Sequence, residues 1–267
     1  MLTTSQEFKD AMRAPVKQVT GYLQLQDGSK ILPGGNLQKF TVEGVGGFLR
    51  TAMSKLSSTL LGEQKLVGSV VDVYYGVTIG TDVEYALKGS FNITEATYDK
   101  EKRTTAIVGY DNMAKFNSDY STVGNYPTTL FDYLQAICSL AGVALENETI
   151  YNGTMPVEED YYQNVGGYSI RDVLEDICEA SASYAVINTS GNIELRQITD
   201  TGEVLTYDDM KEYKLGDYWG GINSLVLSRQ PQNDDVFMRD ESDISAPTTR
   251  NVLDLDKFTV GYKVGDS

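Results

Sequence analysis

Residues 105–138 read TAIVGYDNMAKFNSDYSTVGNYPTTLFDYLQAIC, and they connect a β-type segment to the strongest helix signal of the chain. Thr129 and Asp132 place a hydroxyl and a carboxylate in the first turn of this helix, where backbone N–H groups lack partners. Gly142 is typical of a helix end. Between them, apolar residues recur at the three- and four-residue steps of one helix face, namely Leu130, Tyr133, Leu134, Ile137, Cys138 and Ala141. We therefore predict a helix over Thr129 to Gly142 with a single buried face.

A second copy of this pattern follows further along the chain. Ser169 to Cys178 reads SIRDVLEDIC and repeats the cap, the carboxylate, the Leu, the Ile and the Cys of TLFDYLQAIC. A duplicated site is one interpretation. We favour two amphipathic helices that pack their apolar stripes in one subdomain, because two copies are fewer than a repeat array requires. Tyr184–Asn188 and Asn192–Ile198 flank a Thr-Ser-Gly turn and predict a hairpin.

The N-terminal residues predict a short helix and then a strand. Thr4 and Glu7 resemble a capping box, and Pro15 ends the segment. From Val19 to Leu25, apolar residues alternate with polar ones, and Asp27 with Gly28 supplies a turn.

A long β-rich stretch follows, from Val67 to Tyr110. A second alternating strand begins beyond Gly80, and Phe91–Tyr98 with Arg103–Tyr110 predicts a hairpin. The first strand is marked by alternating Val71, Val73, Tyr75 and Val77. Such an antiparallel meander needs a barrel or a sandwich to bury one face. The preceding segment, Phe48–Leu61, is compatible with a helix and with an irregular strand.

Charge and cysteine content limit the classes of function. The chain contains 22 Lys and Arg residues and 38 Asp and Glu residues, which gives a net charge of −16. This balance disfavours binding to nucleic-acid phosphates or to anionic membranes, and solubility is its simplest explanation. Two cysteines do not form a disulfide framework, and both lie on predicted apolar helix faces. We therefore expect them to be core residues.

The chain contains no histidine. This removes the commonest general base, the Ser–His and Cys–His nucleophile pairs and the usual zinc ligand. Asp132 and Cys138 are candidates of catalytic interest at the helix start, but without a histidine, and with Cys138 on an apolar face, an architectural role is favoured. The acidic clusters at 208–209, 234–235 and 240–243 lack the spacing and the glycine of a calcium loop. We therefore predict no catalytic, cofactor-binding or metal-binding residue, and no cofactor.

Several segments together resemble a known family. In order, they are Asp72–Val77 (DVYYGV), Gly89–Asp99 (GSFNITEATYD), Ile107–Lys115 (IVGYDNMAK), Tyr126–Leu134 (YPTTLFDYL) and Asn223–Asp235 (NSLVLSRQPQNDD). Their pattern and order are similar to the N-terminal region of baseplate hub, or tail-associated, proteins of phages and prophages of Gram-positive hosts. The resemblance spans roughly residues 4–243.

The resemblance implies a structural, non-enzymatic protein of the virion tail, assembled in the host cytoplasm. It implies a homotrimer that closes the distal end of the tail tube and contacts tail tube or distal tail proteins and fibre or lysin components. No membrane anchor is expected. DNA would pass without specific binding, because a carboxylate-rich wall repels phosphates.

The expected fold class is α+β and predominantly antiparallel β. Residues 1–117 would form a first tube-type, β-barrel-like domain, and residues 118–205 an inserted peripheral module with both helices and the hairpin. Residues 206–267 would hold a strand over 222–227 that returns to the barrel, and the start of a further β module, including an alternating strand at 257–264.

The alternative function is that of a carbohydrate-binding or glycan-cleaving tail module. A glycosidase of the carboxylate-pair type needs only two acids across a cleft, and the 18 tyrosines suit either a binding surface or ordinary strands. An enzyme or lectin should present a cleft with paired carboxylates or stacked aromatics. A hub should present ring-forming edges.

Overall fold

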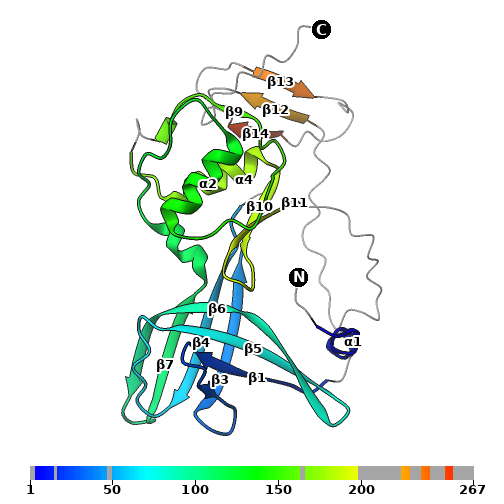
Figure 1. Ribbon diagram of the computed structural model, residues 1–267, viewed down its shortest axis with the longest axis vertical. Helices are drawn as coiled ribbons and strands as arrows, with labels where there is room; N and C mark the ends of the chain where they lie inside the picture. Colours follow the sequence, from blue (N-terminus) through cyan, green and yellow to red (C-terminus); the bar gives the residue numbers. More distant parts are fainter. Residues whose placement is uncertain are drawn as a thin grey trace.

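The computed structural model describes residues 4–14, 17–46, 50–162 and 166–197, together with the backbone of three further strands at 224–228, 236–240 and 250–254. The N-terminal part forms a curled antiparallel sheet, and a helical module lies at one end of it (Figure 1). The predicted class, α+β and predominantly antiparallel β, is confirmed.

The sheet contains seven strands in the order β2-β1-β5-β6-β7-β4-β3, and every neighbouring pair is antiparallel. Their bounds are β1 (Val19–Leu25), β2 (Lys30–Ile31), β3 (Leu37–Val45), β4 (Met53–Leu61), β5 (Val70–Ile79), β6 (Asp82–Asp99) and β7 (Thr104–Tyr110). The end strands β2 and β3 are joined by a turn but do not pair as neighbours, so the sheet is curled and is not a closed barrel.

Strand β6 gives the sheet its bend. Its first part pairs with β5 and its last part with β7, and the two pairings meet at Asn92. The register shifts twice, so Lys88 and Thr94 are extra residues of β-bulges. The sequence predicted two strands here, and the bulges explain why one strand continues through both segments.

The concave face of the sheet encloses an apolar core. Val71 and Val73 are fully buried in this core. The other buried members are Leu23, Leu37, Leu56, Leu60, Leu66, Phe91, Ile93 and Ile107. Val77 is also fully buried, in agreement with the predicted alternation, but it belongs to a separate small cluster with Phe8 and Ala86. Segment 48–61, which the sequence left open, contains strand β4, because Leu56 and Leu60 alternate inward while the backbone pairs on both sides.

Helix α1 (Gln6–Arg13) packs through Phe8 against Val77 of β5 and Ala86 of β6. Its N-cap is Ser5, whose hydroxyl accepts from the N–H of Phe8, and not the predicted Thr4. The reason is tertiary: the backbone N–H of Ser5 and its hydroxyl both donate to the carboxylate of Glu84, at 2.9 and 2.5 Å.

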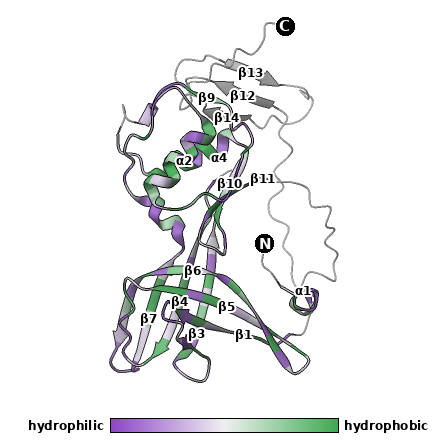
Figure 2. Ribbon diagram, in the orientation of Figure 1, coloured by the Kyte–Doolittle hydropathy of each residue, from purple (hydrophilic) through white to green (hydrophobic). Residues whose placement is uncertain are grey.

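A second apolar core holds the helical module together. It is built from the 3-10 helix η1 (Asn112–Asn117), α2 (Leu130–Ala141), α4 (Ile170–Ala180), β10 (Ser183–Ile187) and β11 (Ile193–Gln197). The short strands β8 (Thr128–Thr129) and β9 (Pro156–Val157) pair beside α2. Hydrophobic residues dominate α2 in Figure 2. The two helices and the hairpin lie at the predicted positions.

The capping predictions for both helices are confirmed. The Thr129 hydroxyl accepts from the N–H of Asp132, and Gly142 ends α2 in the left-handed conformation. At the start of α4, Ser169 and Asp172 form a reciprocal capping box.

The strand predicted near 222–227 is β12 (Ser224–Ser228), but it does not return to the first sheet. It pairs with β13 (Val236–Asp240) and β14 (Arg250–Asp254) in a separate three-stranded sheet. The strand predicted at 257–264 lies outside the described residues. The proposed domain boundaries stay a prediction.

Candidate functional site

The junction between the sheet and the helical module is a set of specific polar contacts. Asp111 follows β7, is 5% exposed, and accepts hydrogen bonds from the backbone N–H groups of Ser54 at 2.7 Å and Met113 at 3.0 Å. Burial raises the pKa of the Asp111 carboxyl, and these hydrogen bonds oppose the shift. One side chain thus connects β4 to the cap of η1.

A second contact ties the chain just before β4 to helix α4. The Thr51 hydroxyl donates to Glu175 at 2.8 Å and accepts from Nε of Arg171 at 2.7 Å. Thr51 is 2% exposed, so the triad is shielded from water at its centre. The backbone N–H of Ala52 also donates to the carbonyl of Ala185 in β10. The two modules are therefore joined by hydrogen bonds as well as by the chain.

A tyrosine patch lies on the face of the sheet opposite the core. Tyr22 and Tyr74 are stacked with ring centroids 4.7 Å apart, and Tyr85 meets Tyr22 edge-on at 4.9 Å. Tyr85 is 41% exposed and Val83 beside it is 39% exposed. Both side chains lie against Gly76, where a Cβ atom would come within 3.0 Å of each. We call Tyr22, Tyr74, Val83 and Tyr85 the tyrosine patch. Tyr22 is 7% exposed and has the Lys30 ammonium 4.7 Å from its ring centroid, so Val83 and Tyr85 form the exposed part of the patch. An exposed apolar surface of this kind is suited to contact with another protein.

The sheet also has incompletely paired edges. Among the described strands, β3 pairs with β4 alone; its first residue, Leu37, also bridges to Pro33. Strand β2 covers β1 at Leu23 and Gln24. Edge strands present backbone groups that another chain can pair with. Lys39 and Glu43 are exposed on β3, as is common on edges that must not aggregate.

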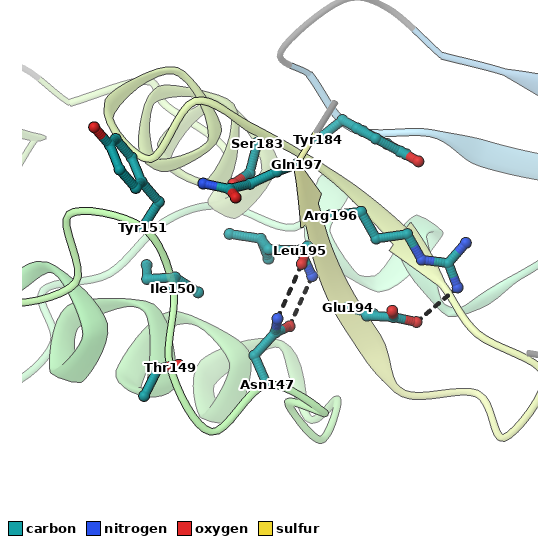
Figure 3. A pocket seen from close by; sticks show the side chains of 10 residues that line it. All are labelled: Asn147, Thr149, Ile150, Tyr151, Ser183, Tyr184, Glu194, Leu195, Arg196 and Gln197. Carbon is teal, nitrogen blue, oxygen red and sulfur yellow. Dashed lines mark hydrogen bonds and ion pairs between the residues drawn. The ribbon is translucent and has the colours of Figure 1, made fainter. Parts of the chain in front are cut away.

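An open groove lies in the helical module (Figure 3). Its volume is about 670 Å³. One wall is the loop that contains Asn147, Thr149, Ile150 and Tyr151, and the other is the β10–β11 hairpin. The sequence did not predict this groove; the nearest local signal is the Asn152-Gly153 turn beside Tyr151.

The two residues considered as catalytic candidates, Asp132 and Cys138, have structural roles in helix α2. Asp132 accepts from the Thr129 hydroxyl at 2.8 Å and completes the cap of α2. Cys138 and Cys178 are free and buried, and burial raises the pKa of the Cys138 thiol to about 12. A thiol with that pKa is protonated and a poor nucleophile at neutral pH.

Within the described ranges, no group of three or more potential metal-ligating side chains comes together. The side chains of the acidic clusters at 208–209, 234–235 and 240–243 lie outside those ranges. Among the helices in the described ranges, none is both long enough and apolar enough to span a membrane.

No protein-family model matches the chain, and no curated protein matches it by sequence. Solved structures do match. A tail protein from Neisseria meningitidis MC58 aligns over 88% of this chain and 71% of its own, with a TM-score of 0.56 and 10% identity. The 43 kDa tail protein of prophage MuSo2 from Shewanella oneidensis aligns over 87% and 71%, with a TM-score of 0.51 and 10% identity. The chain shares the fold of these two tail proteins.

Proposed function

We propose that this protein is a structural component of a phage or prophage tail tip, acting as a hub between the tail tube and distal baseplate or fibre parts. The observation that carries the proposal is the shared fold, which extends over most of the chain in two tail proteins. The junction through Asp111 and Thr51 supports it, because a connecting part needs modules that hold a fixed relation under load. The protein acts by assembly and not by catalysis.

The assembled form we propose is a homotrimer. The free edge of β3 and the tyrosine patch are two surfaces that a neighbouring copy can cover. In a closed ring no strand edge stays exposed, since each copy covers the free edge of the next copy. Contact with tail tube and distal tail proteins would then use the two ends of the ring.

The net charge of −16 supports a role around passing DNA. Carboxylates on the inner wall of a ring repel phosphates over about 10 Å at ordinary ionic strength, so DNA passes without being held. The predicted Gram-positive host stays a prediction.

Light scattering coupled to size exclusion tests the trimer. The expected mass is three times the 29.4 kDa of one chain. Tyr85→Glu places a charge in the tyrosine patch and should shift the mass towards one chain, whereas Tyr151→Glu, at an exposed tyrosine outside the patch, should leave it unchanged. Circular dichroism shows that each variant is folded. A single-chain mass for the parent protein at every concentration would overturn the trimer.

A further inference from the structure

The groove in the helical module has walls that are fixed by hydrogen bonds. The Asn147 side chain accepts from the N–H of Leu195 at 2.8 Å and donates to its carbonyl at 2.9 Å. Figure 3 shows these two bonds between the loop and β11. Both backbone groups of Leu195 are therefore occupied, and an incoming peptide cannot add to β11 as a strand at this point.

The charges in the groove cancel. Glu194 and Arg196 form an ion pair, with Oε2 and Nη2 separated by 2.7 Å. The hydrogen bond from Arg196 lowers the pKa of Glu194, so its carboxylate stays ionised and the pair stays neutral overall. Among the described residues that line the groove, Glu194 and Arg196 are the only charged ones. These described residues offer phosphate and carboxylate ligands no unpaired cation and offer a glycosidase of the carboxylate-pair type no second acid.

Tyr151 is presented at the rim and is 57% exposed. Its turn is held in place by the Asn152 amide, which donates to the carbonyl of Ala180 at the end of α4 at 2.9 Å, and by the N–H of Gly153, which donates to Ile150. A large aromatic ring on a pinned turn offers a flat apolar face at little cost in conformational entropy.

Two polar side chains with unused hydrogen-bonding capacity line the groove. Thr149 and Gln197 line the groove, and neither side chain makes a hydrogen bond within the described residues. The Gln197 amide extends towards the wall that carries Tyr151 (Figure 3). An amide can donate and accept at once, which matches a hydroxyl-rich ligand.

We propose that this groove binds a neutral oligosaccharide, with the apolar face of one sugar ring on Tyr151 near the Gln197 amide, and hydroxyls of further sugar units on Thr149 and Glu194. An exposed aromatic face, amide and hydroxyl groups and a compensated charge are the chemistry that an uncharged polyol requires. The volume lies within the range of about 300–1,000 Å³ typical of small-ligand sites. The site binds glycan and does not cleave it, and it does not depend on the oligomeric state.

Saturation-transfer NMR on the full chain tests this with three neutral trisaccharides, maltotriose, cellotriose and chitotriose, and with inorganic phosphate as the charged probe. We expect transfer to at least one trisaccharide, with a Kd on the order of 1 mM, and none to phosphate. Tyr151→Ala should weaken binding tenfold or more. Tyr85→Ala is the matched control, because it removes an exposed tyrosine from the other module and should leave binding unchanged.

Three outcomes would overturn the site. They are no transfer to any of the three sugars, equal binding by Tyr151→Ala and the parent protein, and phosphate binding that competes with the sugar. Gln197→Ala, at an exposed position, gives a second measurement and should reduce affinity without affecting the melting temperature.

Discussion

The carboxylate of Asp111 accepts a hydrogen bond from the backbone N–H of Ser54 at 2.7 Å across a sequence separation of 57 residues. The same carboxylate caps η1 through Met113, so the end of β7, the start of β4 and the helical module meet at one buried side chain. This contact converts two modules into one connected structure.

Asp111→Ala should lower the free energy of unfolding by about 1–3 kcal/mol, because it leaves the buried N–H groups of Ser54 and Met113 without a partner. Urea denaturation followed by circular dichroism measures the change. Asp82→Ala, at an exposed position in the β5–β6 turn region, is the control and should change stability by less than about 0.5 kcal/mol. Equal effects of the two substitutions would show that the Asp111 contact contributes nothing specific.

Thr51→Val removes a hydroxyl that is hydrogen-bonded to Arg171 and Glu175 while keeping the size of the side chain. We expect a loss of about 1–3 kcal/mol, because both charged partners lose a partly buried hydrogen bond. Thr41→Val, on the exposed edge strand β3, should be close to neutral. Denaturation midpoints of the two variants give the comparison, and a neutral Thr51→Val would rule out the triad as a stabilising contact.

The two cysteines should be unreactive in the folded protein. Burial raises the pKa of both thiols, to about 12 for Cys138, so both remain protonated near pH 8 and both are shielded. A colorimetric thiol reagent should detect none before and two after unfolding in concentrated guanidinium. Rapid reaction of either thiol in the native state would contradict the packing of α2 against α4.

Attachment of helix α1 should depend on pH. Hydrogen bonds from the Ser5 side chain and backbone lower the pKa of Glu84 below its ordinary value of 4.5. A lowered carboxyl pKa contributes stability above the unfolded value, and that stability is lost as the pH falls through the folded one. The protection of the Phe8 amide against exchange, measured relative to the intrinsic rate of an unstructured peptide at the same pH, should therefore fall as the pH falls below 4.5.

Glu84→Gln is the control for that experiment. It should lower the protection of the Phe8 amide already at neutral pH and should remove the further loss of protection at low pH. Identical pH profiles for the variant and the parent would mean that Glu84 does not hold the helix.

Local patterns predicted the elements whose signals are contained within a few residues. Helices α2 and α4 follow from cap residues three positions apart and from one apolar stripe each. The choice of Ser5 over Thr4 as N-cap depends on Glu84, 79 residues away, and no local rule contains that contact. The Thr51–Glu175 hydrogen bond spans 124 residues and likewise could not be predicted from local sequence patterns.

Local alternation along strand β6 also does not predict which of its residues form the tyrosine patch. Val83 and Tyr85 share the odd-numbered alternation of Phe91 and Ile93, yet the first pair is exposed and the second is buried. The bulge at Lys88 shifts the register by one residue and moves the alternation to the other face of the sheet. Alternation identified the strand, but the pairing partner decided which face each side chain occupies.

Cryo-electron microscopy of the purified assembled chain tests the hub proposal most directly. The proposal predicts three-fold rings around an open channel whose wall carries more carboxylates than amines, with the tyrosine patch covered by a neighbouring copy. Particles that remain single chains at all concentrations, or rings with a basic channel, would contradict it.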